Sequence, residues 1–330
     1  PTGGPPGDGS VRAARPRRAQ ARRRCAVADV LTADLAVALT REPAAPQLLW
    51  MLEERGLGAW ERRPAGRVFV LFPVVRTFVA ERVREEHPDE WVLAQLAAAR
   101  WYLTNGYPVE ALRHAVGAGD LGLASSAVSR YWGELLEPQA LARLDVLKSL
   151  PQTDLRRWPL LAGALAIHHD SVPGERTEAI ETYQLTLAAL RPRARTTSTA
   201  ERVVLDVLES VALRSTNATQ RALEPARRAR QTLDELGVDE RRELVRELPR
   251  LRAEVAMSFA RAGADEEALA TLEDLGGSPA VDPRTLYGLS LRALVLALRG
   301  DLPEAVRGLE VVEAARPAEV RAGRADHLSR

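Results

Sequence analysis

Five histidines, one cysteine and a short acidic run are among the residues of this 330-residue chain whose types could support catalysis or metal binding. His168, His169 and Asp170 are adjacent and form the densest set of metal-ligand types. Neighbouring positions on a helix point about 100° apart, so these three side chains cannot meet at one ion. We therefore interpret them as a helix end that leads into a turn at residues 171–174.

The other reactive residue types also favour structural interpretations. His114 lies on an otherwise apolar helix face, where a hydrogen-bonded core histidine is expected, and His87 precedes a proline at a helix end. The acidic run 265–267 falls in the first turn of a helix, where it complements the helix dipole. Cys25 has no nearby histidine in the sequence to activate it, and as the only cysteine it cannot form an intrachain disulfide.

The sequence lacks the usual motifs of nucleotide binding and of acyl transfer. No Gly-rich loop with Lys and Ser/Thr is found, and Lys148 is the only lysine of the chain. There is also no Gly-x-Ser-x-Gly elbow. We therefore expect that the chain is not an enzyme, and that it holds no catalytic residue, no metal ligand set and no cofactor.

Aromatic side chains are the remaining candidates for ligand contacts, although they make up only 5% of the chain. Those in the first half recur at helical spacing, and most are expected to pack between helices. Four of them are our candidates for binding an effector or a partner on the inner surface of a helical superhelix: Trp101, Tyr102, Tyr131 and Trp132.

The elements that must position these residues are helical. Ala, Leu, Arg and Glu dominate, and such residues lose little on entering a helix. No apolar run reaches the roughly 18 residues that a membrane-spanning helix needs, so no membrane contact is expected. The chain begins with no apolar secretory signal, and a single cysteine fits a reducing compartment. We therefore expect a cytoplasmic protein.

The net charge of +1 conceals an arginine-rich segment at residues 1–24, which carries seven arginines and one acid. The segment is also rich in Gly and Pro and has little to bury, so we expect it to be disordered. Clustered arginines can neutralise phosphates, which would make it a nucleic-acid-binding arm, and the alternative is a solvated tail. No aromatic residue interleaves the arginines, and the rest of the chain is mildly acidic. Direct nucleic-acid binding is therefore not expected.

Residues 25–88 are predicted to form a helix, a second helix, a short strand pair and a third helix. The first helix face follows a spacing of three and four residues, at Val27, Val30, Leu31, Leu35 and Leu39. Thr32 can cap a helix that starts at Ala33, and residues 67–72 are rich in strand formers. On the third helix, the residues expected to face inward are Val74, Val75, Phe78, Val79 and Val83.

A repeated pattern organises the chain after residue 89. A glycine, three residues and then Glu-Ala occur at 106–111, 174–179, 263–268 and 300–305, and a weaker copy at 217–222 has asparagine first. The intervals are 68, 43, 46 and 37 residues, of which the first is twice the tetratricopeptide period of about 34. The glycine suits a helix end, the glutamate meets the next helix dipole, and the small alanine allows close approach. A solenoid of helix pairs is predicted.

Several segments resemble one family of regulators. Residues 26–35, 48–57 and 72–79 are similar to the winged-helix segment of LuxR-type, MalT-like transcriptional regulators of the signal-transducing nucleotide-triphosphatase group. Residues 99–106 and 110–120 are similar to the first helical repeats of that family. Members often have a histidine where Phe72 stands. The resemblance implies the middle of such a regulator, with nucleotide-binding and DNA-binding domains that this chain does not include.

We therefore predict an all-α chain with a disordered tail at 1–24, a small winged-helix module at 25–88 and a tetratricopeptide-like α-solenoid at 89–330. The resemblance implies a sensor and transducer region that binds a protein or small-molecule effector through its repeats and transmits this binding to transcription. The alternative is a stand-alone scaffold for protein–protein interaction. Direct DNA binding through the winged helix and the basic arm, and an enzyme, are further alternatives.

Overall fold

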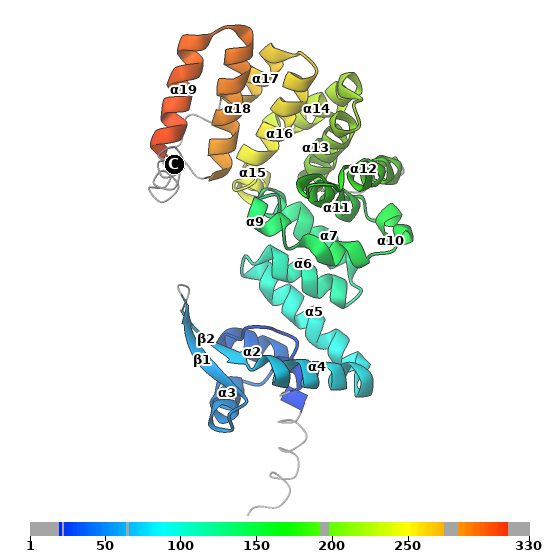
Figure 1. Ribbon diagram of the computed structural model, residues 1–330, viewed down its shortest axis with the longest axis vertical. Helices are drawn as coiled ribbons and strands as arrows, with labels where there is room; N and C mark the ends of the chain where they lie inside the picture. Colours follow the sequence, from blue (N-terminus) through cyan, green and yellow to red (C-terminus); the bar gives the residue numbers. More distant parts are fainter. Residues whose placement is uncertain (1–19, 22, 64–65, 192–197, 274–282, 316–330) are drawn as a thin grey trace, which may run out of the picture. The chain divides into compact units, whose positions relative to one another are not determined.

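The computed structural model describes residues 20–21, 23–63, 66–191, 198–273 and 283–315 (Figure 1). These residues are mostly helical, as the composition predicted, and the described part contains one two-stranded sheet. The chain divides into two compact units, residues 1–127 and residues 128–330. The boundary expected at residues 88 and 89 lies inside the first unit.

The first unit begins with the predicted order of helix, helix, strand pair and helix. Its elements are α2 (Ala33–Thr40), α3 (Ala45–Glu54), β1 (Gly58–Arg63), β2 (Gly66–Leu71), α4 (Pro73–Glu86), α5 (Pro88–Thr104) and α6 (Pro108–Gly117). Thr32 caps α2 as expected, because its hydroxyl accepts a hydrogen bond of 3.1 Å from the backbone N–H of Leu35. Helix α5 packs against α2, α4 and α6.

Leu31 is not part of the first helix, which corrects the helical face predicted for residues 27–39. It forms an isolated antiparallel bridge with Phe69 on β2. The Leu31 N–H donates to the Phe69 carbonyl at 2.9 Å, and the Phe69 N–H donates to the Leu31 carbonyl at 2.8 Å. On its other side Phe69 is paired with Trp60 of β1. The bridge gives hydrogen-bond partners to the backbone N–H and carbonyl of Phe69. Because buried backbone groups must be paired, this bridge decides the conformation of Leu31, although the spacing of Leu31 is helical.

Helix α4 turns only one of its two apolar stripes inward. Val75 and Val79 pack against the core of the first unit, and Val83 is buried. Val74 and Phe78 were also predicted to face inward, but their exposed fractions are 81% and 61%. The inward residues follow the i, i+4, i+8 stripe of a helix, and the exposed pair belongs to the adjacent stripe. The prediction merged two neighbouring faces of one helix.

The last residues of the arginine-rich segment are ordered. Residues 23–25 are helical, and Arg23 Nε lies 2.9 Å from Glu90 Oε2. Arg24 Nε lies 3.5 Å from Glu90 Oε1, and the Glu90 side chain is only 11% exposed. Two arginines around one nearly buried carboxylate on α5 explain why this end of the segment departs from the expected disorder. Residues 1–19 and 22 lie outside the described residues.

The repeated glycine pattern marks the turns of helix pairs. Gly106, Gly174, Gly263 and Gly300 have φ between 78° and 93°, and Asn217, in the weaker copy, has φ of 62°. This left-handed conformation is accessible to glycine and, next best, to asparagine. The alanine five residues later is buried in every copy, at Ala111, Ala179, Ala222, Ala268 and Ala305. The pattern therefore predicted the helix ends correctly.

Most of these turns close with the same backbone hydrogen bond. The residue after the turn donates to the carbonyl five positions earlier, as in Tyr107 to Tyr102 at 2.9 Å, Ala218 to Leu213 at 2.8 Å and Ala264 to Phe259 at 2.9 Å. This bond is the signature of the Schellman motif and satisfies a carbonyl that the helix end leaves free. The turn at Gly174 differs, because Glu175 donates to Val172 instead.

The second unit is a succession of helix pairs (Figure 1). After α7 (Leu121–Arg130), which contains the boundary, come α8 (Trp132–Leu135), α9 (Pro138–Leu141), the 3₁₀ helix η1 (Leu144–Ser149) and α10 (Gln152–Arg157). The pairs are α11 (Pro159–Ser171) with α12 (Arg176–Leu190), α13 (Thr199–Ser215) with α14 (Thr219–Asp234), α16 (Leu248–Arg261) with α17 (Asp265–Leu272), and α18 (Pro283–Arg299) with α19 (Leu302–Ala315). Helix α15 (Val238–Leu244) precedes α16.

Each pair packs on the next through both of its helices: α11 and α12 contact α13, α13 and α14 contact α16, and α16 and α17 contact α18. Among the described residues, no helix has both the length and the apolar content needed to cross a membrane.

Candidate functional site

The aromatic residues predicted to bind a ligand fall in different environments. Trp101 and Tyr102 lie on α5, where Trp101 is partly exposed and stacks on Tyr107 with a centroid distance of 6.1 Å. Tyr102 is buried and stacks on His114 at 5.2 Å. Tyr131 and Trp132 belong to the second unit, where both side chains are buried. Of the four, Trp101 is the residue that borders an open cleft.

His114 is a core histidine, as predicted. Its side chain is buried, and its Nδ1 lies 2.5 Å from Gln95 Oε1, to which it donates a hydrogen bond. Burial, with a contribution from the neighbouring Arg113, lowers the pKa of His114 to about 4. The imidazole is therefore neutral at pH 7, and it packs as part of the core between α5 and α6.

A cleft of about 440 Å³ lies between α2 and α5 in the first unit. This volume is within the range of about 300–1,000 Å³ that is usual for ligand pockets. Apolar side chains of α5 form its floor, with Leu93, Leu96 and Trp101 among them. Its polar lining is dominated by arginines: Arg24, Arg41 and Arg100.

Sequence reasoning did not find these three arginines as a group. They come from three separate segments, and Arg24 belonged to the segment expected to be disordered. The single local signal was the position of Arg100 next to Trp101 in the sequence. Only the packing of α5 on α2 brings the arginines to one cleft.

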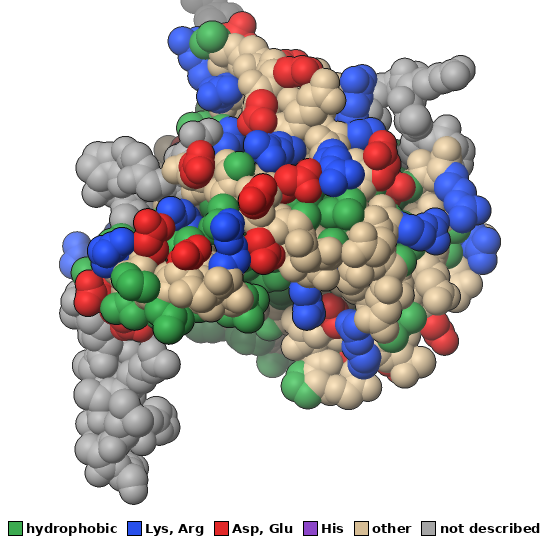
Figure 2. Space-filling view, turned by 90° about the horizontal axis from the view of Figure 1, so that it is seen from above, with side chains coloured by type: hydrophobic (Ala, Val, Ile, Leu, Met, Phe, Trp, Pro, Cys, Tyr) green, Lys and Arg blue, Asp and Glu red, His purple; other side chains and the backbone are tan. Residues whose placement is uncertain are grey.

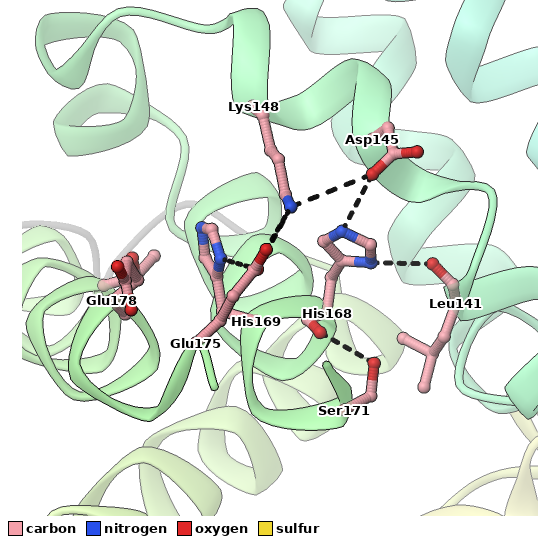
Figure 3. A network of polar contacts seen from close by, with 9 residues as sticks. Leu141, Asp145, Lys148, His168, His169, Ser171, Glu175 and Glu178 are labelled. Carbon is pink, nitrogen blue, oxygen red and sulfur yellow. Dashed lines mark hydrogen bonds and ion pairs between the residues drawn. The ribbon is translucent and has the colours of Figure 1, made fainter. Parts of the chain in front are cut away.

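The two adjacent histidines of α11 have different partners (Figure 3). His168 is buried, its Nδ1 donates to the Leu141 carbonyl at 2.8 Å, and its Nε2 lies 3.2 Å from Asp145 Oδ1. His169 instead donates from Nδ1 to Glu175 Oε2 at 2.7 Å. The two rings are therefore engaged in separate contacts on either side of the helix end.

Lys148 joins the two halves of this network (Figure 3). Its Nζ lies 2.9 Å from Glu175 Oε1 and 3.9 Å from Asp145 Oδ1. Hydrogen bonds from Lys148 and His169 lower the pKa of Glu175. The network ties η1 to the end of α11 and to the turn that follows it. Among the described residues, no three His, Cys, Asp or Glu side chains are placed to hold a metal ion.

A cluster of buried charges in the second unit joins three successive helix pairs. Glu254 of α16 is 5% exposed and pairs with Arg214 of α13 and, at 2.9 Å, with Arg250. The Arg250 guanidinium lies 4.0 Å from the ring centroid of Tyr287 on α18. Burial would raise the pKa of Glu254, but the two arginines outweigh it and lower the pKa. The carboxylate is thus charged and fully compensated.

Exposed large apolar side chains occur in both units. In the first unit they are Trp50, Phe72, Val74, Phe78, Val92, Leu93 and Tyr107. In the second unit Val238 and Val245 are exposed, and the others lie on the last described pair, at Leu294, Leu298, Leu302, Val306, Leu309 and Val311. On the face shown in Figure 2, acidic and basic side chains are interspersed around apolar areas, so neither sign of charge dominates it.

Sequence comparison relates part of the chain to transcriptional regulators. It is 34% identical over 140 residues to the HTH-type transcriptional regulator MalT of Yersinia enterocolitica, Yersinia pestis and Yersinia pseudotuberculosis. This chain is similar to a segment of MalT. The aligned region covers 42% of the chain and only 16% of the MalT sequence. No family model matches the chain, and no solved structure matches it.

Proposed function

We propose that the chain is the sensor and transducer region of a LuxR-type, MalT-like transcriptional regulator that acts in the cytoplasm. In this proposal residues 25–88 are a winged-helix module, and the helix pairs from residue 89 onward are tetratricopeptide-like repeats that bind an effector or a partner protein. The role is binding and not catalysis. The observation that carries the proposal is the recurrence of left-handed helix-pair turns in a chain that is similar to part of MalT.

The exposed stripe of α4 supports a transducing role. Phe72, Val74 and Phe78 are 46%, 81% and 61% exposed, although the same helix buries its other stripe. Exposed apolar residues of this size on one element are typical of a contact surface. We propose that this stripe contacts a neighbouring domain of the regulator. An effector on the repeats then changes the population of the state in which that contact is made.

Transcript profiling tests this proposal. A strain whose gene carries Val74→Asp and Phe78→Asp should change the transcript level of a defined set of genes by several-fold. Both residues are exposed, so the purified variant should keep the melting temperature of the wild type. Val238→Asp is the matched control, because Val238 is 70% exposed but lies in the second unit. The proposal fails if the α4 variant and the control have the same transcript profile.

A stand-alone scaffold for protein–protein interaction is the second candidate. The observation that favours it is the apolar surface of α18 and α19, where Leu298 is 74% exposed. A scaffold would lose a co-purifying protein when Leu294 and Leu298 are replaced by Glu, without any change in transcript levels. A regulator would change transcript levels in the α4 variant whether or not this surface is altered.

A further inference from the structure

We propose that the cleft between α2 and α5 is a binding site for a small organic anion, with a carboxylate or phosphate group attached to an apolar part. The cleft joins cationic walls to an apolar floor. Arg24, Arg41 and Arg100 line it, and no Asp or Glu is among its lining residues. The site lies on α5, the first of the helices proposed to bind an effector, so its role rests on the proposed function. Its ligand binding can be measured on the purified chain whether or not transcript levels respond.

The charge of the cleft is largely uncompensated. Among the described residues, neither Arg41 nor Arg100 forms an ion pair, and both side chains are exposed to solvent. Arg24 is different, because Glu90 lies 3.5 Å from its Nε and the Leu39 carbonyl lies 3.5 Å from its Nη1. These contacts hold the Arg24 guanidinium in place at the edge of the cleft. Two free cations beside one fixed cation favour a ligand with negative charge.

The apolar side of the cleft indicates that the anion is organic. Leu93 is 54% exposed, and Leu96, Ala97 and Trp101 continue the same face of α5. Free phosphate or another inorganic ion would leave this face in contact with water. A ligand with a ring or a short aliphatic part would cover it, and the indole of Trp101 offers a flat contact surface.

The backbone at Arg41 supports a role for its side chain. Arg41 ends α2 with φ of 60°, and its N–H donates to the Val37 carbonyl at 2.8 Å. A residue with a Cβ is strained in this conformation, in which glycine is not. A helix end of this kind therefore needs no arginine for stability. We therefore assign the Arg41 side chain to ligand binding, since the fold does not require it.

Calorimetric titration of the full chain tests the site. The anionic probes are phenyl phosphate and phenylacetate, which separate a phosphate from a carboxylate ligand, and benzyl alcohol is the neutral analogue. We expect at least one anion to bind at least tenfold more tightly than benzyl alcohol, and its affinity to fall with added salt. Inorganic phosphate should bind at least tenfold more weakly than the preferred anion. The proposal is overturned if the neutral analogue binds as well as both anions.

Three variants separate ligand binding from structure. Arg41→Gly should weaken binding about tenfold while raising the melting temperature, because glycine relieves the left-handed strain. Arg100→Gln should also weaken binding about tenfold without changing the melting temperature. Arg55→Gln is the control: it removes an exposed arginine of the first unit that does not line the cleft, and binding should stay within twofold. Equal losses in Arg100→Gln and Arg55→Gln, or a lower melting temperature in Arg41→Gly, would refute the proposed site.

Discussion

Replacing a helix-end glycine by alanine measures what the left-handed turns contribute to the second unit. Gly263 has φ of 78°, and a Cβ added there would meet no atom within 4 Å. Gly263→Ala therefore introduces no clash, and its cost is the strain of an L-residue in the left-handed region, about 1–2 kcal/mol. We expect the free energy of unfolding of the second unit to fall by that amount.

Two further substitutions serve as comparisons for Gly263→Ala, because they are expected to stabilise the protein or to leave its stability almost unchanged. Gly308 lies inside α19, and a Cβ there would meet the Ala293 side chain at 3.4 Å, which is ordinary contact. Gly308→Ala should therefore stabilise by about 0.5–1 kcal/mol, because alanine loses less entropy in a helix. Asn217 already occupies the left-handed region with φ of 62°. Asn217→Gly should stay within about 0.5 kcal/mol, since relief of strain is offset by the entropy of the unfolded glycine.

Urea unfolding followed by circular dichroism gives the free energies, with the slope of the transition as a check that the unfolded state is unchanged. Hydrogen exchange followed by mass spectrometry then locates the effect in the peptides of α16 and α17. Equal effects of Gly263→Ala and Gly308→Ala would refute the reasoning, because the two positions differ in backbone conformation and neither added Cβ clashes with a neighbour.

Three other outcomes are expected. An NMR titration should give the His114 imidazole a pKa of about 4. Because the unfolded chain takes up this proton near pH 6.5, about 3 kcal/mol of the stability present above pH 6.5 is lost as the pH falls toward 4. His114→Gln should remove that part of the pH dependence. In urea unfolding, Arg214→Ala should cost about 3–5 kcal/mol, because it leaves the buried Glu254 with one partner fewer. Arg227→Ala breaks an exposed pair with Glu267 and should lower the free energy of unfolding much less; similar costs would contradict this assignment. Cys25 is fully buried and its pKa is raised to about 12, so iodoacetamide should label it only after unfolding.

Features that depend on neighbouring residues in the chain could be predicted from the sequence. Thr32 caps α2 because its hydroxyl reaches an N–H three residues away. The helix ends at Gly106, Gly174, Gly263 and Gly300 follow from the conformational freedom of glycine alone. Such local features can be predicted from the spacing of residues alone. Asn217, in the weaker copy, also ends its helix in the left-handed conformation.

Features that depend on distant packing could not be predicted in this way. The spacing of Leu31 is helical, but a strand 38 positions further on supplies its backbone partners. The spacing of the valines on α4 indicates two adjacent apolar stripes, and only the position of the core decides which stripe is buried. The arginine cleft is the extreme case, because Arg24, Arg41 and Arg100 share no sequence pattern and meet only after α5 packs on α2.

The packing of α5 on α2 also limits how this protein can be recombined with its relatives. A junction placed at residue 88, where the sequence suggests that one module ends, would separate α2 from the helix that covers it and Glu90 from its two arginines. The first unit extends to residue 127 and includes α6. In a chimaera that exchanges the amino-terminal part, α5 and α6 should therefore come from the same parent as α2.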